Sequence, residues 1–209
     1  MTPLVTVFDL DGTLTRSDTS VAFLRFVAGS LAVARGLAAA GAAAAPDLVR
    51  AWRRETREPR VGGTTGRWEA LLHERIIRRT LRGRPREELR ERGAAFAAAL
   101  VADSLRDDVL RRLEDHRARG DRVIVASASL DLYVEPAARL LGCDAGVGSH
   151  LEFHGGVATG HLAGLPCWGE EKLRRVRAIL EPGTEIAHAY GNSAGDEALF
   201  RVAREGRRV

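Results

Sequence analysis

The chain has 209 residues, of which 45% are hydrophobic and 29% charged, and its formal net charge is +4. A chain of this length and composition can bury a sizeable core, which excludes wholesale disorder. The basic balance suits nucleic acid, anionic headgroups or small anionic substrates, or reflects a general preference for arginine. Cys143 and Cys167 show no metal-ligand spacing and the first residues show no secretory pattern. We therefore expect a cytoplasmic protein with free thiols.

The first predicted element is a buried parallel strand. Residues 4–8 form a short apolar run that ends at Asp9, where a loop begins. A helical pattern then covers residues 17–101, with no strand candidate. Its last helices are expected at residues 66–83 and 84–103. This organisation predicts an all-helical cap inserted after the first strand.

Residues 21–45 are apolar and rich in alanine, which raises the question of a membrane span. Arg25 and Arg35 interrupt the segment, and alanine is only weakly hydrophobic. A pair of helices in a water-soluble domain is therefore favoured over a membrane span, and no membrane partner is expected.

From residue 102 onwards, helical patterns alternate with apolar runs that are typical of strands. Strands are predicted within residues 121–129, 145–148 and 184–193, and a hairpin around residues 153–157. Helices are predicted at residues 103–119, 131–141, 169–181 and 195–205. Strands that alternate with helices predict an α/β fold with a Rossmann-like parallel sheet. We expect this core to comprise residues 1–16 and 102–209, with the cap at residues 17–101.

Ligands of an open parallel sheet bind outside the carboxyl ends of its strands. The polar residues expected at those ends are Asp9, Asp11, Ser127, Ser129, Asn192, Ser193 and Asp196. Of the 32 basic residues Lys172 is the one lysine, and it begins the helix before the last strand. Carboxylates, an amide, hydroxyls and an ammonium at one edge predict a site for a hard cation and a phosphate group. Ser129 is instead expected to cap the following helix.

Four segments in order carry a resemblance to a known family: VFDLDGTLT at residues 7–15, VASAS at 125–129, GEEKL at 169–173 and YGNSAGDEALF at 190–200. Together they resemble the motifs of the haloacid dehalogenase superfamily. The chain is most similar to the phosphoserine-phosphatase-like branch, whose helical cap follows the first motif. The resemblance covers about residues 4–202 and is weakest through the cap.

The resemblance implies catalytic roles for four residues. Asp9 would be the nucleophile, and Asp11 would protonate the leaving alkoxide and later deprotonate the hydrolytic water. Ser127 would donate a hydrogen bond to a phosphoryl oxygen, and Lys172 would offset the negative charge. Relatives that cleave carbon–halogen bonds lack a carboxylate at the position of Asp11. The presence of Asp11 therefore indicates that the substrates are phosphate esters.

The resemblance also implies a Mg²⁺ site and a substrate site. The implied metal ligands are Asp9, the backbone carbonyl of Asp11, Asn192 and, through water, Asp196. The implied substrate-binding residues are Gly12, Asp18, Ser127, Ala128 and Lys172. Asp18 stands where phosphoserine phosphatases carry a glutamate that binds the substrate amine, so phosphoserine is not favoured over other small phosphomonoesters.

Two departures from the family pattern affect these expectations. The fourth motif usually begins Gly-Asp, whereas this chain has Gly191-Asn192, and the lost charge predicts a raised magnesium requirement. The sequence stops shortly after the last predicted helix. We therefore expect the sheet to lack an edge strand or to borrow one from a partner, in a monomer or a homodimer.

The function expected from the sequence is Mg²⁺-dependent hydrolysis of a small phosphorylated metabolite through an aspartyl-phosphate. A phosphotransferase of the same superfamily and a catalytically impaired phosphate-binding homologue stay open as alternatives. Nucleic-acid binding is not favoured, because the arginines are spread over amphipathic helices without interleaved aromatic residues.

Overall fold

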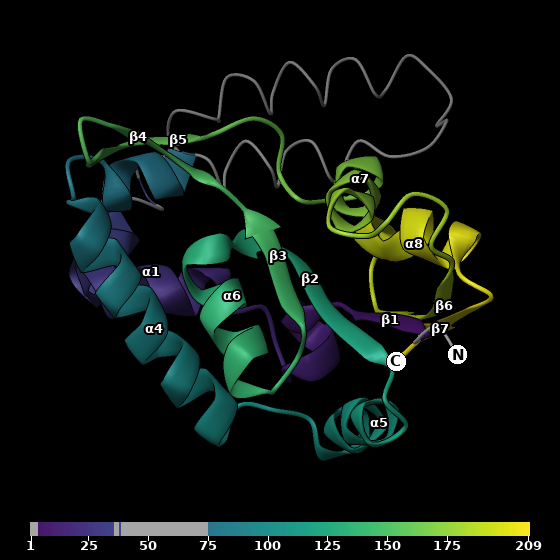
Figure 1. The fold of residues 1–209 in the computed structure, drawn as a ribbon. Helices are drawn as coiled ribbons and strands as arrows, with labels where there is room; N and C mark the ends of the chain where they lie inside the picture. Colours follow the sequence, from purple (N-terminus) through teal and green to yellow (C-terminus); the bar gives the residue numbers. More distant parts are fainter. Residues whose placement is uncertain (1–3, 36–37, 39–74) are drawn as a thin grey trace, which may run out of the picture.

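The computed structural model describes residues 4–35, 38 and 75–209 (Figure 1). Its centre is a five-stranded sheet in the order β3-β2-β1-β6-β7, in which all neighbours are parallel. The strands are β1 (Val5–Phe8), β2 (Arg122–Leu130), β3 (Ala145–Ser149), β6 (Ile186–Gly191) and β7 (Glu205–Arg208). The predicted α/β class with a parallel sheet is confirmed.

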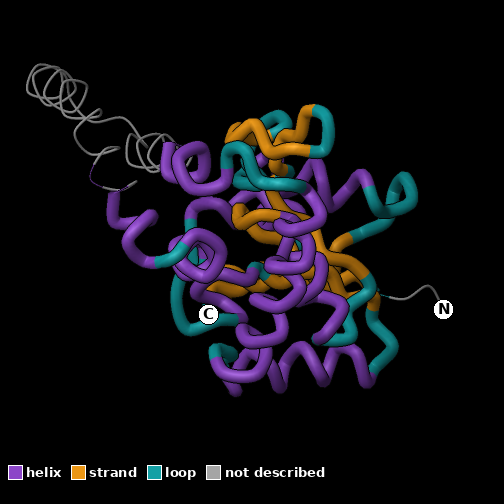
Figure 2. Tube along the Cα trace, turned by 90° about the vertical axis from the view of Figure 1, so that its left-hand side faces the viewer, coloured by secondary structure: helices purple, strands orange, loops and turns teal. Residues whose placement is uncertain are grey.

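Helices cover both faces of the sheet, as Figures 1 and 2 show. The helices are α1 (Ser20–Ala28), α4 (Arg86–Asp103), α5 (Asp107–Ala118), α6 (Asp131–Leu140), α7 (Glu170–Ala178) and α8 (Glu197–Val202). Phe8, Val123 and Val125 share one apolar cluster with residues of α1, α4, α5 and α6. Val7 and Ile124 share a second cluster with residues of α7 and α8. Both faces of the central strands are therefore buried, which explains their continuous apolar runs.

The last residues of the chain form an edge strand of the sheet. Strand β7 pairs in parallel with β6, from His188 opposite Glu205 to Gly191 opposite Arg208. The expectation that this chain lacks the strand is therefore wrong. The pattern was missed because Glu205–Arg208 is a charged and exposed segment, which has none of the apolar character of a buried strand.

A two-stranded hairpin, β4 (Leu151–His154) and β5 (Val157–Leu162), follows β3 as predicted. Main-chain hydrogen bonds tie this hairpin to the segment before α4: Gly83 donates to Ala158, Ala158 to Arg84 and Arg86 to Gly156. The Arg86 guanidinium also lies 4.3 Å from the centre of the Phe153 ring. The hairpin thus connects the core to the last part of the predicted cap.

The described part of the predicted cap is helical. Besides α1 and α4, residues 30–35 and 75–81 are helical, and within the described residues of 17–101 the structure contains no strand. The rest of the predicted cap, residues 36–37 and 39–74, lies outside the described residues, and so does the first half of the helix expected at 66–83. The boundaries at residues 16 and 102 stay predictions.

Helices α4 and α6 approach each other closely at Gly93. A Cβ atom on Gly93 would lie 2.0 Å from the carbonyl oxygen of Leu132. Pro136 lies inside α6 and has no N–H, so it cannot bond this carbonyl four residues earlier. Pro136 leaves the Leu132 carbonyl without its usual partner within the helix. Gly93, which has no side chain, lets α4 come close to this carbonyl.

A buried histidine, His116, lies near the end of α5. Its surroundings indicate how the free energy of unfolding depends on pH. The Nε2 atom of His116 is 3.0 Å from the Tyr190 hydroxyl, and its Nδ1 atom is 2.6 Å from Asp121. Burial lowers the pKa of His116 below its ordinary value, although Asp121 opposes the shift.

The unfolded chain therefore binds a proton at this position at a higher pH than the folded chain does. We expect the free energy of unfolding to fall as the pH drops below about 6.5. Urea unfolding between about pH 7 and pH 5 measures this slope. The slope should be shallower in His116→Gln, and equal slopes in the two proteins would contradict the assignment.

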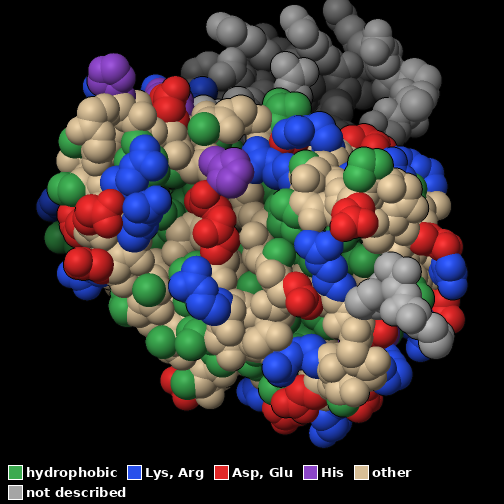
Figure 3. Space-filling model, viewed as in Figure 1, with side chains coloured by type: hydrophobic (Ala, Val, Ile, Leu, Met, Phe, Trp, Pro, Cys, Tyr) green, Lys and Arg blue, Asp and Glu red, His purple; other side chains and the backbone are tan. Residues whose placement is uncertain are grey.

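In the described part of the chain, none of the helices has the length and hydropathy of a membrane span. On the face shown in Figure 3, acidic side chains lie among the basic ones. Several arginines form ion pairs with acidic residues, as in Arg201–Glu170, Arg204–Glu185 and Arg208–Glu197.

Candidate active site

The carboxyl ends of β1 and β6 meet at the point where the sheet changes its direction of growth. From β1 the chain adds β2 and β3 on one side, and then β6 and β7 on the other. Ligands of open α/β sheets bind in the crevice at such a switch point. Asp9 follows β1 and Asn192 follows β6, so the first and fourth motifs meet there.

Lys172 lies between two buried carboxylates. Its Nζ atom is 2.9 Å from Oδ1 of Asp9 and 2.6 Å from Oδ1 of Asp196. The three residues are 2%, 4% and 1% exposed respectively. The other Asp9 oxygen, Oδ2, accepts a hydrogen bond from Thr13 Oγ1 at 3.0 Å. The structure therefore brings together three predicted site residues that lie up to 187 positions apart in the sequence.

The charges in this cluster do not balance. Burial raises the pKa of Asp9 to about 7, against the opposing effect of Lys172, and repulsion from Asp196 and Asp11 adds to the rise. Burial alone would lower the pKa of Lys172, but Asp9 and Asp196 raise it above its ordinary value, so the ammonium stays charged. One ammonium faces two carboxylates, and a further cation would favour ionised Asp9.

Asp11 lies beside Asp9 and is surrounded by hydrogen-bond donors. Its Oδ2 atom accepts from Ser127 Oγ at 2.6 Å and from Ser129 Oγ at 2.7 Å. Its Oδ1 atom accepts from the backbone N–H of Thr19 at 2.8 Å and from Thr19 Oγ1 at 2.5 Å. The prediction that Ser129 caps the next helix is wrong, because α6 has no side-chain cap and the Ser129 hydroxyl points to Asp11.

The loop between β1 and α1 requires glycine at position 12. Gly12 has a φ of 69°, and a Cβ atom there would lie 2.1 Å from Nδ2 of Asn192. Any other side chain would strain the backbone and displace Asn192. Gly12 thus allows the first and fourth motifs to touch.

Asn192 and Asp196 of the fourth motif make different contacts. Asn192 donates from Nδ2 to the backbone carbonyl of Asp11 at 3.1 Å. Asp196 accepts from Lys172 on Oδ1 and, on Oδ2, from the Asn192 N–H, the Ser193 N–H and the Ser193 hydroxyl. Asp196 therefore orders the loop and Lys172, and its predicted contact to a metal through water stays a prediction.

The other predicted substrate-binding residues come from the end of β2 and from the segment before α1. Ser127 and Ala128 come from the end of β2, where the Ala128 carbonyl accepts a hydrogen bond from Ser149 at 2.6 Å. Asp18 is exposed just before α1, and its Oδ1 atom accepts from the Ser20 N–H at 2.8 Å. No contact ties Asp18 to the other site residues within the described part of the chain, so its role stays a prediction.

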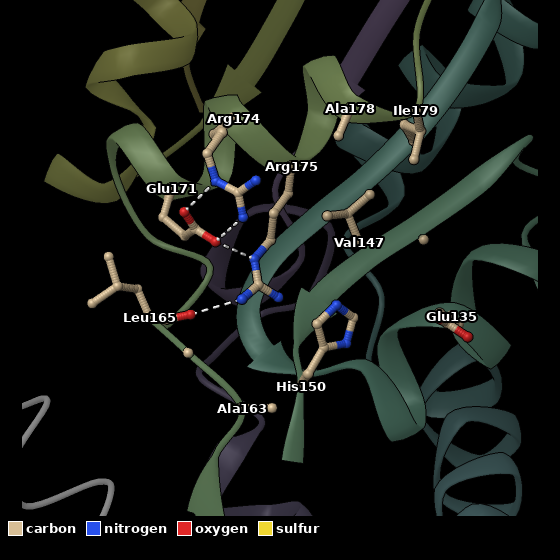
Figure 4. A pocket seen from close by; sticks show the side chains of 12 residues that line it. Glu135, Val147, His150, Ala163, Leu165, Glu171, Arg174, Arg175, Ala178 and Ile179 are labelled. Atoms are coloured by element: carbon tan, nitrogen blue, oxygen red, sulfur yellow. Dashed lines mark hydrogen bonds and ion pairs between the residues drawn. The ribbon is translucent and has the colours of Figure 1, made fainter. Parts of the chain in front are cut away.

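Ion pairs at the start of α7 fix the backbone that carries Lys172 (Figure 4). Arg175 donates to Glu171 at 2.7 Å and to the backbone carbonyls of Gly148 and Leu165 at 2.7 and 2.8 Å. Hydrogen bonds from Arg174 and Arg175 lower the pKa of Glu171 to about 2. These residues line a cavity of about 580 Å³ at the β3 edge, and the predicted site residues are not among the described residues that line it.

Thr13, Thr19 and Tyr133 belong to the site although no sequence pattern predicted them. Thr13 contacts Asp9, Thr19 contacts Asp11, and the Tyr133 hydroxyl lies 3.0 Å from Thr19 Oγ1. The spacing of Thr13, four residues after Asp9 in a tight loop, was an available signal. Tyr133 gave none, because a tyrosine in an apolar helix face is usually a packing residue.

The oxygen atoms around the crevice fit a hard cation. Among the described residues, no three or more His, Cys, Asp and Glu side chains converge as a metal site. The available donors are instead a carboxylate of Asp9, the carbonyl of Asp11 and the amide of Asn192. A half-turn of that amide places its oxygen near the Asp11 carbonyl, now 3.1 Å from Nδ2. Oxygen donors of these kinds are what Mg²⁺ prefers, so the three residues would suit this ion.

Comparison with known proteins agrees with this geometry. The sequence model of the haloacid dehalogenase-like hydrolases matches residues 6–201. The chain belongs to this family. The hydrolase is also 32% identical to protein CicA of Caulobacter vibrioides over 207 residues, which cover 97% of this chain and 84% of CicA. The superfamily indicated by the four motifs is confirmed.

Solved structures show the same fold at lower identity. A Bordetella pertussis protein of unknown function has a TM-score of 0.68 and 22% identity, and the match covers 99% of the hydrolase and 89% of that chain. A phosphoserine phosphatase in apo form has a TM-score of 0.58 and 19% identity, with 99% and 86% covered. A phospho-aspartyl intermediate analogue of phosphoserine phosphatase has a TM-score of 0.56 at 19% identity, with 99% and 86% covered.

Proposed function

We propose that this hydrolase is a phosphatase that hydrolyses a small phosphomonoester through an aspartyl-phosphate on Asp9. The observation that carries the proposal is the contact of Lys172 with both Asp9 and Asp196 at the switch point of the sheet. Phosphoryl transfer depends mainly on positioning and on neutralising charge, and this cluster is suited to both tasks.

In the first step, an Asp9 oxygen attacks phosphorus as the bond from phosphorus to the ester oxygen breaks. The leaving alkoxide takes a proton from Asp11 and departs as an alcohol. The Lys172 ammonium offsets the charge that the phosphoryl group brings toward Asp9. The Ser127 hydroxyl, 2.6 Å from Oδ2 of Asp11, is placed to turn toward a phosphoryl oxygen.

In the second step, water attacks the phosphorus of the aspartyl-phosphate. Asp11, now ionised, takes a proton from this water while the bond from phosphorus to the Asp9 oxygen breaks. Inorganic phosphate leaves and the Asp9 carboxylate is restored. The same carboxylate thus acts first as acid and then as base, which requires Asp11 to lie beside Asp9 throughout.

Mg²⁺ is the cofactor that the oxygen donors favour, with Asp9, the Asp11 carbonyl and Asn192 as its ligands. It would supply positive charge to the phosphoryl oxygens and favour ionised Asp9. Asp9, whose pKa is about 7 without the ion, gains most from this charge.

The Asn192→Asp variant tests the amide ligand. A carboxylate at this position adds one negative charge to the donor set, so Mg²⁺ should bind about ten-fold more tightly. Calorimetric titration with MgCl₂ measures the affinity independently of turnover. Asn192→Ala is the matched control and should bind more weakly than the unchanged protein. Equal affinities in all three proteins would count against Asn192 as a ligand.

A screen of phosphorylated metabolites with Mg²⁺, in which phosphate release is measured, would identify the substrate class. We expect release from one or a few small phosphomonoesters and its loss in the presence of EDTA. Added alcohol acceptors distinguish a phosphotransferase, because phosphorylated acceptor would then appear in place of free phosphate. Binding of phosphate without turnover of any ester, p-nitrophenyl phosphate included, would favour an impaired homologue.

A further inference from the structure

The hydroxyl groups around Asp11 form two chains that extend beyond the residues assigned above. The first runs from the Ser20 hydroxyl to Ser129 Oγ at 3.1 Å and on to Oδ2 of Asp11. The second runs from the Tyr133 hydroxyl to Thr19 Oγ1 at 3.0 Å and on to Oδ1 of Asp11. The first chain joins α1 to β2, and the second joins Thr19, the residue just before α1, to α6.

The direction of each hydrogen bond follows from the chemistry of Asp11. In the ionised state that the second step requires, the Asp11 carboxylate can only accept, so Thr19 and Ser129 donate hydrogen bonds to it. Their oxygens are then left as acceptors for Tyr133 and Ser20. Burial and the nearby Asp11 raise the pKa of Tyr133 well above its ordinary value, so the phenol keeps its proton and can donate.

We propose that Thr19, Ser129 and Tyr133 are positioning residues that fix the orientation of the Asp11 carboxylate for proton transfer. The proposal rests on the proposed function, in which Asp11 is the acid and base. None of the three residues needs to touch the substrate. Thr19 and Ser129 act on Asp11 directly, and Tyr133 acts through Thr19.

Burial gives these contacts their effect. Thr19, Ser129 and Tyr133 are 4%, 1% and 0% exposed, so water cannot easily replace a lost hydroxyl. The Tyr133 ring is fixed between Phe23 of α1 and Phe96 of α4, with ring centres 4.7 and 5.1 Å away. Its hydroxyl is therefore rigidly placed, and the packing would survive the change to phenylalanine.

The two Asp11 oxygens differ in the donors that face them. Oδ1 faces the backbone N–H of Thr19, which cannot turn away, whereas the donors to Oδ2 among the described residues are the hydroxyls of Ser127 and Ser129. A hydroxyl can rotate and become an acceptor. The arrangement therefore places the transferable proton on Oδ2, beside the Ser127 hydroxyl and the crevice, while Thr19 fixes Oδ1.

Two esters with different leaving groups test the proposal. An alkyl phosphate needs a proton from Asp11 when its alcohol departs, whereas p-nitrophenolate leaves as a stable anion. We expect Thr19→Val, Ser129→Ala and Tyr133→Phe each to lower kcat for the alkyl ester about 10- to 100-fold with little change in KM. The first-turnover release of p-nitrophenolate should change much less.

Matched variants separate positioning from stability. Thr19→Ser keeps the hydroxyl and should restore the rate with the alkyl ester. Tyr190→Phe removes the other tyrosine hydroxyl, which contacts His116, and should leave the ratio of kcat for the alkyl ester to the first-turnover rate of p-nitrophenolate release unchanged. Thermal unfolding of every variant reports any general loss of stability.

The outcomes are distinct. A selective loss with the alkyl ester, restored in Thr19→Ser, supports the proposal. Equal losses with both esters, or no loss, in a protein that turns both over would overturn the positioning role and leave the proposed function intact. If the unchanged protein releases phosphate from neither ester, the proposed function itself fails, and the positioning role fails with it.

Discussion

The Asp9→Asn variant is expected to lose phosphate release by a factor on the order of 10⁴ or more, as when other catalytic nucleophiles are removed. An amide is a far weaker nucleophile than a carboxylate, and it cannot accept the phosphoryl group as an acyl phosphate. Because burial already disfavours the charge on Asp9, the neutral side chain should keep the fold. Phosphate release from the best substrate of the screen measures the effect.

Asp103→Asn is the matched control, because it makes the same chemical change on an exposed carboxylate at the end of α4. It should keep wild-type turnover. If Asp9→Asn retained a tenth or more of the activity, the nucleophile would have to be another residue.

The Lys172→Met variant is expected to lose both activity and stability. It leaves Asp9 and Asp196 facing each other without a cation, and breaking a buried ion pair costs about 3–5 kcal/mol. Loss of the ammonium should also lower kcat about 10²- to 10³-fold, by analogy with the removal of one preorganised donor. Urea unfolding and phosphate release measure the two effects separately.

A double variant distinguishes these two effects. Lys172→Met combined with Asp196→Asn removes one of the unpaired carboxylates, so stability should partly recover while activity stays low. Lys172→Arg keeps the charge and should fold, but its planar group cannot replace the compact ammonium between two carboxylates. Wild-type turnover in Lys172→Arg or Lys172→Met would contradict the role of Lys172.

The parts of the fold that could be predicted from sequence are those with strong local patterns. The apolar run before Asp9 and the alternation after residue 102 predicted the parallel sheet, because buried strands are continuously apolar. Strand β7 escaped prediction because its residues Glu205–Arg208 are charged and exposed, without the apolar run of a buried strand. The cap prediction is confirmed only as helical structure in its described residues.

The candidate site also has a part that could be predicted from the sequence and a part that could not. Four motifs predicted which side chains meet at the switch point, and the structure brings Asp9, Lys172 and Asp196 into contact. The environment of Asp11 could not be predicted, because Ser129 of β2 contacts Asp11, and Tyr133 of α6 contacts Thr19, only once the fold brings these segments together. A helix cap was a better local explanation for Ser129, and tertiary contacts overrode it.

The most direct test of the account is to trap the phosphoryl group on Asp9. In Asp11→Asn with p-nitrophenyl phosphate, the first step needs no proton, while the second step lacks its base, so the phosphorylated enzyme should accumulate. After an acid quench and digestion with trypsin, mass spectrometry should find one phosphoryl group on the peptide of residues 1–16, and none in Asp9→Asn combined with Asp11→Asn. A phosphoryl group on another peptide, or steady turnover by the double variant, would contradict the account.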